Sequence, residues 1–218
     1  GIIMSTINVD NIAEYTSSGK INATHDIKLA SGKSVLNSDG KATGALVLLA
    51  SEEMSSTSAV EFFTATTGWT KAKYNAFKIV CSNIKMSSDG ARIYCKFYGG
   101  STARTGTAES GGYQSRIDTS ASGYYGGLNF TDYLELIPFG IGNGTREGAT
   151  IEATIFPSDG TTALAGFGHG IMEGTSGNVY HNNYGYHYDS TASIDGAKIY
   201  ASTGSMTSGH ISFYGISK

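Results

Sequence analysis

The feature that most restricts the fold of this chain is a short-range alternation of apolar and polar residues. In residues 92–98, RIYCKFY, an extended backbone places Ile93, Cys95 and Phe97 on one face and the residues between them on the other. A strand of this kind is half buried: one side packs on a core and the other side meets solvent. The alternation therefore predicts β-structure over this segment.

Similar short runs recur along the chain, whereas no window has the sustained three- and four-residue apolar spacing of a helix. The best helical candidate is one short turn at residues 69–74. The runs predict about eight to ten strands. They lie at residues 45–50, 60–63, 77–81, 93–97, 134–137, 151–155, 164–167, 179–188, 197–201 and 210–216. Many short strands without intervening helices favour an all-β, antiparallel, jelly-roll-like β-sandwich.

Turn signals separate several of these runs. Asp and Gly tolerate the positive φ angles of tight turns, so each Asp-Gly pair predicts a reversal of the chain. The four pairs are Asp39-Gly40, Asp89-Gly90, Asp159-Gly160 and Asp195-Gly196. Residues 99–127 are rich in Gly, Ser and Thr and carry little bulk, so we expect a long excursion at one end of the sandwich.

Composition excludes several classes of partner. The formal net charge is −3 and the 15 basic residues are scattered, whereas a nucleic-acid surface needs clustered Lys and Arg. No apolar stretch approaches the ~18 residues that span a bilayer, so we expect no membrane insertion.

The two cysteines, Cys81 and Cys95, lie in alternating runs that a hairpin would bring together. Both a disulfide and free thiols in a reducing cytosol are compatible with this arrangement.

The chain lacks the spaced motifs of common enzymes. It has no Gly-x-Ser-x-Gly, no His-Glu-x-x-His, no phosphate-binding Gly-Lys-Ser/Thr loop and no Cys-x-x-Cys. The acidic residues Asp132, Glu135, Glu147 and Glu152 are the available glycosidase-type carboxylates, and we expect them to be solvated surface groups. The sequence therefore predicts a protein that is not an enzyme, with no cofactor and no metal.

The most distinctive local pattern is NVYHNNYGYHYDS, residues 178–190. As a strand, it puts four tyrosines on one face: Tyr180, Tyr184, Tyr186 and Tyr188. His181, Asn183, His187 and Asp189 lie on the other face. One interpretation is a ligand surface, with the tyrosines and His187 contacting sugars or proteins. The alternative is that the tyrosine row packs the sandwich or a subunit contact.

Two other features concern partners. Tyr124 and Tyr125, between glycines, are candidates for an exposed aromatic tip on a flexible loop that binds a ligand, or for packing against the edge of the sandwich. A metal site of His181, His187 and Asp189 has suitable ligand types but no diagnostic spacing.

Residues 1–41 differ from the rest of the chain because their apolar residues are isolated. Strands with so few apolar residues cannot form a hydrophobic core of their own. We therefore expect residues 1–41 to be an extended N-terminal segment that anchors or oligomerises the protein, followed by a β-sandwich at residues 42–218. The residues expected to do so are Ile7, Val9, Ile12, Ile21, Ile27, Leu29, Val35 and Leu36.

Three segments carry a resemblance to a known class. MSTINVDNI (4–12), followed by INATHDIKLASGKSVLNSDG (21–40), resembles the N-terminal segments of tailed-bacteriophage virion proteins. Residues 46–97 resemble the first half of jelly-roll domains in phage tail-fibre and minor structural proteins, and the ending ISFYGISK resembles their terminal strand.

The resemblance implies a non-enzymatic virion structural protein of the tail-fibre or head-decoration type, assembled in the bacterial cytoplasm. Its implied partners are capsid, portal or tail proteins. Because three chains can bury together the apolar residues that one leaves exposed, we expect a homotrimer. The alternatives are a host-adhesion module that binds surface polysaccharide, as at the receptor-binding tip of a tail fibre, and a capsid cement protein.

Overall fold

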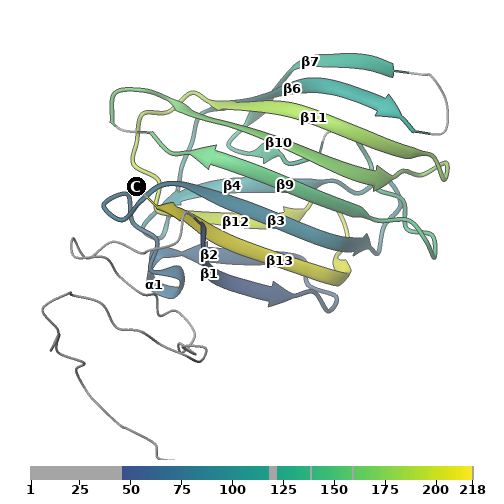
Figure 1. Cartoon of the computed structure of the whole chain (residues 1–218), viewed down its shortest axis with the longest axis horizontal. Helices are drawn as coiled ribbons and strands as arrows, with labels where there is room; N and C mark the ends of the chain where they lie inside the picture. Colours follow the sequence, from purple (N-terminus) through teal and green to yellow (C-terminus); the bar gives the residue numbers. More distant parts are fainter. Residues whose placement is uncertain (1–45, 118–121, 138, 159, 218) are drawn as a thin grey trace, which may run out of the picture.

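The computed structural model describes residues 46–117, 122–137, 139–158 and 160–217, which form a sandwich of two antiparallel β-sheets (Figure 1). The predicted all-β, antiparallel β-sandwich is confirmed, and the jelly-roll topology stays a prediction. The predicted N-terminal segment, with its eight apolar residues and Asp39-Gly40, lies outside the described residues.

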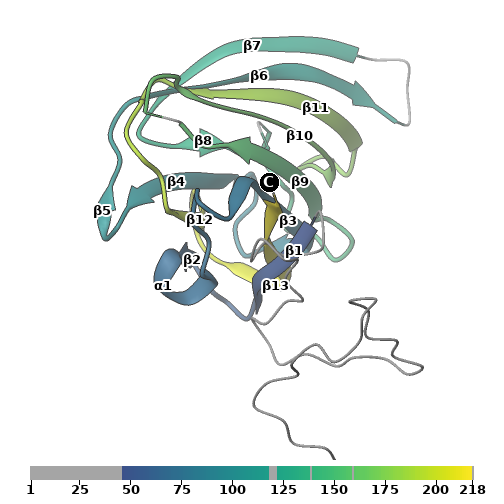
Figure 2. The ribbon, with the colours of Figure 1, turned by 60° about the vertical axis from the view of Figure 1, so that its left-hand side comes forward.

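The larger sheet has eight strands in the order β1-β13-β3-β9-β10-β11-β6-β7. Their bounds are Leu46–Glu53 (β1), Met206–Ser217 (β13), Tyr74–Met86 (β3), Ala149–Phe156 (β9), Leu164–Glu173 (β10), Val179–Tyr188 (β11), Thr107–Arg116 (β6) and Ser122–Thr131 (β7). Figure 2 shows this sheet curving over the smaller sheet, which lies on its inner side. We call the face turned away from the smaller sheet the outer face.

The smaller sheet contains five strands. Its hydrogen-bonded neighbours follow the order β2-β12-β4-β5, and β8 also pairs with β4. These are Ala59–Phe63 (β2), Gly196–Ala201 (β12), Ile93–Gly99 (β4), Thr102–Ala103 (β5) and Leu134–Glu135 (β8). The chain passes repeatedly between the two sheets: β1 is in the larger sheet, β2 in the smaller, β3 in the larger and β4 in the smaller. The core therefore forms from residues far apart in the sequence.

Aromatic rings fill the space between the sheets. Phe213 of β13 stacks on Phe62 of β2 and on Phe77 of β3, with ring centroids 5.2 and 5.1 Å apart. Phe97 of β4 meets Phe77 and Tyr188 edge-on at 6.2 and 5.6 Å. All five side chains are buried. The predicted alternation of β4 is confirmed, because Ile93, Cys95 and Phe97 face this core.

Glycines in β10 make room for the tyrosines of β11. A Cβ atom added at Gly168 would lie 2.7 Å from the Tyr184 ring, 2.9 Å from the Tyr186 hydroxyl and 2.6 Å from the main-chain oxygen of Glu152. At Gly170 it would lie 3.0 Å from the Tyr184 hydroxyl. Glycine at every second position of residues 166–170 therefore leaves room for the tyrosine side chains of β11.

The predicted excursion at residues 99–127 is wrong. This stretch contains β5, β6 and most of β7, and β6 and β7 are paired strands of the larger sheet. Glycine there permits close backbone packing, since a Cβ atom at Gly112 would lie 2.0 Å from the main-chain oxygen of Asn183 in β11. The scarcity of large side chains in this stretch thus reflects tight packing between strands. The described residues contain thirteen strands, more than predicted.

The predicted short turn at residues 69–74 is present, because the N–H groups of Lys73 and Tyr74 both donate to the Thr70 carbonyl at 3.0 Å. The short helix α1 covers Thr64–Thr67, and Gly68 ends it in a left-handed conformation with φ of 65°. The predicted segment that follows contains the buried Trp69, whose ring packs edge-on against Phe77, and it leads directly into β3. Packing of the buried Trp69 against Phe77 anchors this turn, whereas the helix α1 before it was not predicted.

The Asp-Gly predictions have mixed outcomes. Asp89-Gly90 forms a turn between β3 and β4, with φ of 75° at Gly90, as predicted. Gly160 also has a positive φ, 95°, whereas Asp159 lies outside the described residues. Asp195-Gly196 is not a reversal: Gly196 is the first residue of β12, where a Cβ atom would lie 2.4 Å from the Phe63 ring.

Replacing Gly168 with alanine tests the fit between β10 and β11. The new methyl group would contact the backbone of β9 as well as Tyr184, so we expect a loss of about 1–3 kcal/mol in the free energy of unfolding. The control is Gly185→Ala in β11, where the nearest atom to a new Cβ lies 4.0 Å away. Urea denaturation measures both, and equal stabilities for the two variants would contradict this packing.

Both cysteines are free and buried in the core, so the possible disulfide is absent. Burial raises the pKa of Cys81 to about 12 and also raises that of Cys95. A thiol reagent at pH 8 is therefore expected to label neither residue in the folded protein and both in urea without reductant. Labelling that requires prior reduction would instead indicate a disulfide.

Candidate functional site

The tyrosine row of β11 faces the interior. Tyr184, Tyr186 and Tyr188 are at most 5% exposed. The Tyr186 hydroxyl donates a hydrogen bond to the main-chain oxygen of Leu136 at 3.0 Å, and burial raises its pKa well above the ordinary range. The predicted ligand face therefore does not fit these three rings, and the alternative, packing inside the sandwich, describes them.

His187 lies on the opposite, outer face of the same strand. Its Nδ1 is 3.4 Å from a carboxylate oxygen of Glu109 in β6, and both side chains are about half exposed. They border an open hollow where Gly111 and Gly185 pair across the two strands. Within the described ranges, no three His, Cys, Asp or Glu side chains gather in a group that could hold a metal ion.

Tyr124 and Tyr125 belong to β7, where they pair with Tyr113 and Gly112 of β6. The expected flexible loop is therefore wrong for their backbone. These positions occupy an edge strand of the larger sheet.

Tyr180 has a different setting from the other tyrosines of its row. It is partly exposed and borders a cleft of about 350 Å³ that also involves β6 and loops from both sheets. The other side chains of interest around this cleft are Arg92, Gln114, Phe139, Thr175 and Ser176. A volume of this size is within the range of small-molecule binding sites.

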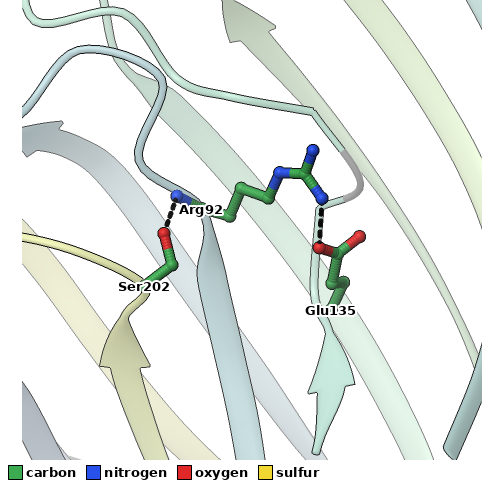
Figure 3. Close-up of polar contacts among 3 residues, drawn as sticks. All are labelled: Arg92, Glu135 and Ser202. Atoms are coloured by element: carbon green, nitrogen blue, oxygen red, sulfur yellow. Dashed lines mark hydrogen bonds and ion pairs between the residues drawn. The ribbon is translucent and has the colours of Figure 1, made fainter. Parts of the chain in front are cut away.

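Arg92 is held in place from two directions (Figure 3). Its main-chain N–H donates to the Ser202 hydroxyl at 2.9 Å, and the Ser202 N–H donates to the Arg92 carbonyl at 2.9 Å. Its Nη1 donates to Oε1 of Glu135 at 2.6 Å. The Glu135 side chain is fully buried whereas that of Arg92 is 39% exposed, so the pair joins the interior to the cleft.

The burial of Glu135 contradicts the expectation that this carboxylate is solvated. Desolvation raises its pKa, while the hydrogen bond and charge of Arg92, together with the nearby Tyr94 hydroxyl, act in the opposite direction. Its second oxygen, Oε2, has no hydrogen-bond partner among the described residues. Arg92 is therefore the main compensation for a charge that burial disfavours.

The outer face of the larger sheet is unusually apolar. Among the described residues six large hydrophobic side chains are exposed, and five of them lie on this face. They are Leu46 and Leu48 of β1, Phe156 of β9, and Phe167 and Ile171 of β10. The rings of Phe156 and Phe167 are 6.1 Å apart. Scattered apolar residues need no explanation, but a concentration on one sheet face is typical of an interaction surface.

Polar groups lie between the apolar ones on the outer face. Lys78 of β3 and Glu152 of β9 form an ion pair there, and Tyr214 and Ile216 of β13 are partly exposed opposite Leu48 and Leu46. The face is therefore amphipathic, as in protein interfaces that are exposed before assembly.

Sequence reasoning named Tyr180 and His187 as ligand-binding candidates and Glu135 only as a solvated carboxylate, and it missed Arg92 and Gln114. Their segments are separated by tens of residues, and only the β4–β8 and β6–β11 pairings bring them near the cleft. One signal was available: Arg92 begins an alternating run whose apolar members face the core, so its own side chain had to point away from that core.

Comparisons with protein families, with curated proteins and with solved structures found no match for this chain. The described part of the chain contains no helix with the length and hydrophobicity needed to cross a membrane. The site must therefore be interpreted from its own chemistry.

Replacing Arg92 with alanine tests the ion pair. It would leave a buried carboxylate without its cation, so we expect a loss of about 3–5 kcal/mol at pH 7. The pKa of Glu135 is raised by burial, and it would rise further without Arg92. The folded variant would then hold the Glu135 proton more tightly than the unfolded chain, and its stability deficit should shrink as pH falls from 7 toward the ordinary carboxyl value of 4.5.

The matched variant is Glu135→Gln, which removes the buried charge and leaves a partly exposed Arg92 that water can solvate. We expect a smaller loss than in Arg92→Ala, with little change in the deficit over the same pH range. Urea unfolding of both variants beside the wild type gives the comparison. Equal, pH-independent losses would contradict the electrostatic role of the pair.

Proposed function

We propose that this chain is a non-enzymatic structural subunit of a tailed-phage virion, which assembles as a homotrimer through the outer face of its larger sheet. The virion assignment is supported by the resemblance of residues 4–12, 21–40 and 46–97 to phage structural proteins. Within the particle, residues 1–41 would contact capsid, portal or tail proteins, and the sandwich would project outward.

The observation that carries the assembly proposal is the apolar outer face. Phe167 is 56% exposed and Ile171 is 49% exposed, although the core between the sheets is already filled by other side chains. Burying one such side chain contributes about 1.5–3 kcal/mol. Several copies gain this stabilisation together if the face is covered by another subunit, and closed symmetry satisfies every copy equally.

A second candidate function is adhesion to a saccharide of the host surface. It is favoured by the cleft at Arg92, where hydrogen-bonding groups and aromatic rings meet. Polar groups that fix orientation beside an apolar wall are the usual composition of small-molecule sites. Assembly and adhesion are compatible, because the two surfaces use different side chains. Phe167 and Ile171 are exposed on the outer face, and neither lines the cleft.

Introducing a charge on the outer face tests the assembly proposal. Native mass spectrometry of the wild-type chain at micromolar concentration should give three times the mass of one chain. Phe167→Glu should give mainly the monomer, because assembly would bury its carboxylate without a partner. Since Phe167 is exposed, the substitution should leave the thermal unfolding of the monomer nearly unchanged.

The control is Thr102→Glu, which adds the same charge at an exposed position of β5 in the smaller sheet. This variant should remain a trimer. A wild-type monomer at micromolar concentration would contradict the proposal outright. A trimer that survives Phe167→Glu would exclude the outer face as its interface.

A further inference from the structure

The cleft at Arg92 has walls fixed by main-chain hydrogen bonds. The Ile141 N–H donates to the Ala91 carbonyl at 2.8 Å, and the Gly90 N–H donates to the Ile141 carbonyl at 3.0 Å. On the other side, the Gly142 N–H donates to the Glu173 carbonyl at 3.1 Å. The loop after β8 is thus joined both to the segment before β4 and to the end of β10. A ligand would enter a site whose backbone is already ordered, which lowers the entropic cost of binding.

Gln114 brings an unused amide to this cleft. Its Nε2 is buried and has no hydrogen-bond partner among the described residues. Because no hydrogen bond among the described residues holds this NH2 group, it is available to a ligand in the cleft. Asn182, opposite Gln114 in β11, is fully buried and both of its amide atoms also lack partners among the described residues. Unpaired buried amides are rare in folded proteins, and a bound polar molecule is one explanation.

Arg92 adds further donors. The hydrogen bond to Glu135 uses Nη1, whereas the guanidinium carries five N–H groups, and the side chain is 39% exposed along the cleft. The net charge of Arg92 and ionised Glu135 together is zero. The site therefore offers directed donors without the excess positive charge that would select a phosphate or a polyanion.

One wall of the cleft is aromatic. The rings of Phe139 and Tyr180 stack with centroids 6.4 Å apart, and the Asn178 side-chain amide donates to the Tyr180 hydroxyl at 3.3 Å. At the rim, Thr175 and Ser176 are exposed and carry hydroxyl groups. Ring faces next to amide, guanidinium and hydroxyl groups suit a molecule with an apolar face and many hydroxyl oxygens.

We propose that this cleft binds a pyranose unit of an uncharged surface polysaccharide, with Gln114 and Arg92 donating to its hydroxyl oxygens and Tyr180 packing against the ring. The proposal rests on the second candidate function and gives it a site and a ligand class. Thr175 and Ser176 would contact the neighbouring sugar unit at the rim.

The test is binding of the full-length protein to an array of bacterial surface glycans, neutral and acidic. We expect the wild type to bind at least one neutral glycan. Gln114→Leu should weaken binding to that glycan about tenfold or more, because it replaces a hydrogen-bond donor with an apolar group of similar size. Its stability should be equal or higher, since the substitution removes a buried NH2 group that has no partner among the described residues. Thr102→Leu, at an exposed site in β5, should bind like the wild type.

Arg92→Lys gives a second variant that keeps the positive charge beside Glu135 but loses the planar set of donors. It should also weaken binding while remaining folded. The outcomes separate the two levels of the proposal. No glycan bound by the wild type would overturn both the adhesion function and this site. Binding unaffected by Gln114→Leu and Arg92→Lys would leave adhesion standing and overturn the site, as would a preference for acidic glycans alone.

Discussion

The structure depends on aromatic packing between two sheets that alternate along the chain. Phe77 and Phe213 come from the larger sheet and Phe97 comes from the smaller. The ring centroid of Phe77 lies 5.1 Å from that of Phe213 and 6.2 Å from that of Phe97. The tyrosines of β11 also point into this interior, and they require glycine on the neighbouring strand β10, as at Gly168. With the interior filled in this way, the sandwich needs no further apolar residues. Those that remain on the outer face, such as Phe167, call for a different explanation.

We propose separate roles for two surfaces of the sandwich. The outer face supplies exposed apolar area suited to another protein surface, whereas the cleft at Arg92 supplies a small volume with directed donors. Exposed apolar area on a sheet contributes through burial alone, so it favours association without specifying a small ligand. The buried Glu135 instead fixes the orientation of a single guanidinium. A subunit that assembles through one surface keeps the other available, which is what a displayed adhesion module requires.

Sequence alternation predicted the strands with bulky, regularly spaced residues best, and the bounds predicted for β11 coincide with those observed. It failed for β6 and β7, because glycines such as Gly112 give no hydrophobic signal although tight backbone contacts require them. Alternation also separated the two faces of β11 without indicating which one is inward. The Arg92–Glu135 pair could not be predicted, since it depends on the β4–β8 pairing of distant segments.

The most direct test of the central claim, that copies of this chain associate through the outer face, is an experimental structure of the protein in its assembled form. The quantities to measure are the exposed fractions of Phe167 and Ile171, which are 56% and 49% in the single chain. The account predicts that both fall nearly to zero against a neighbouring copy. An assembly in which both side chains keep these exposures would contradict it.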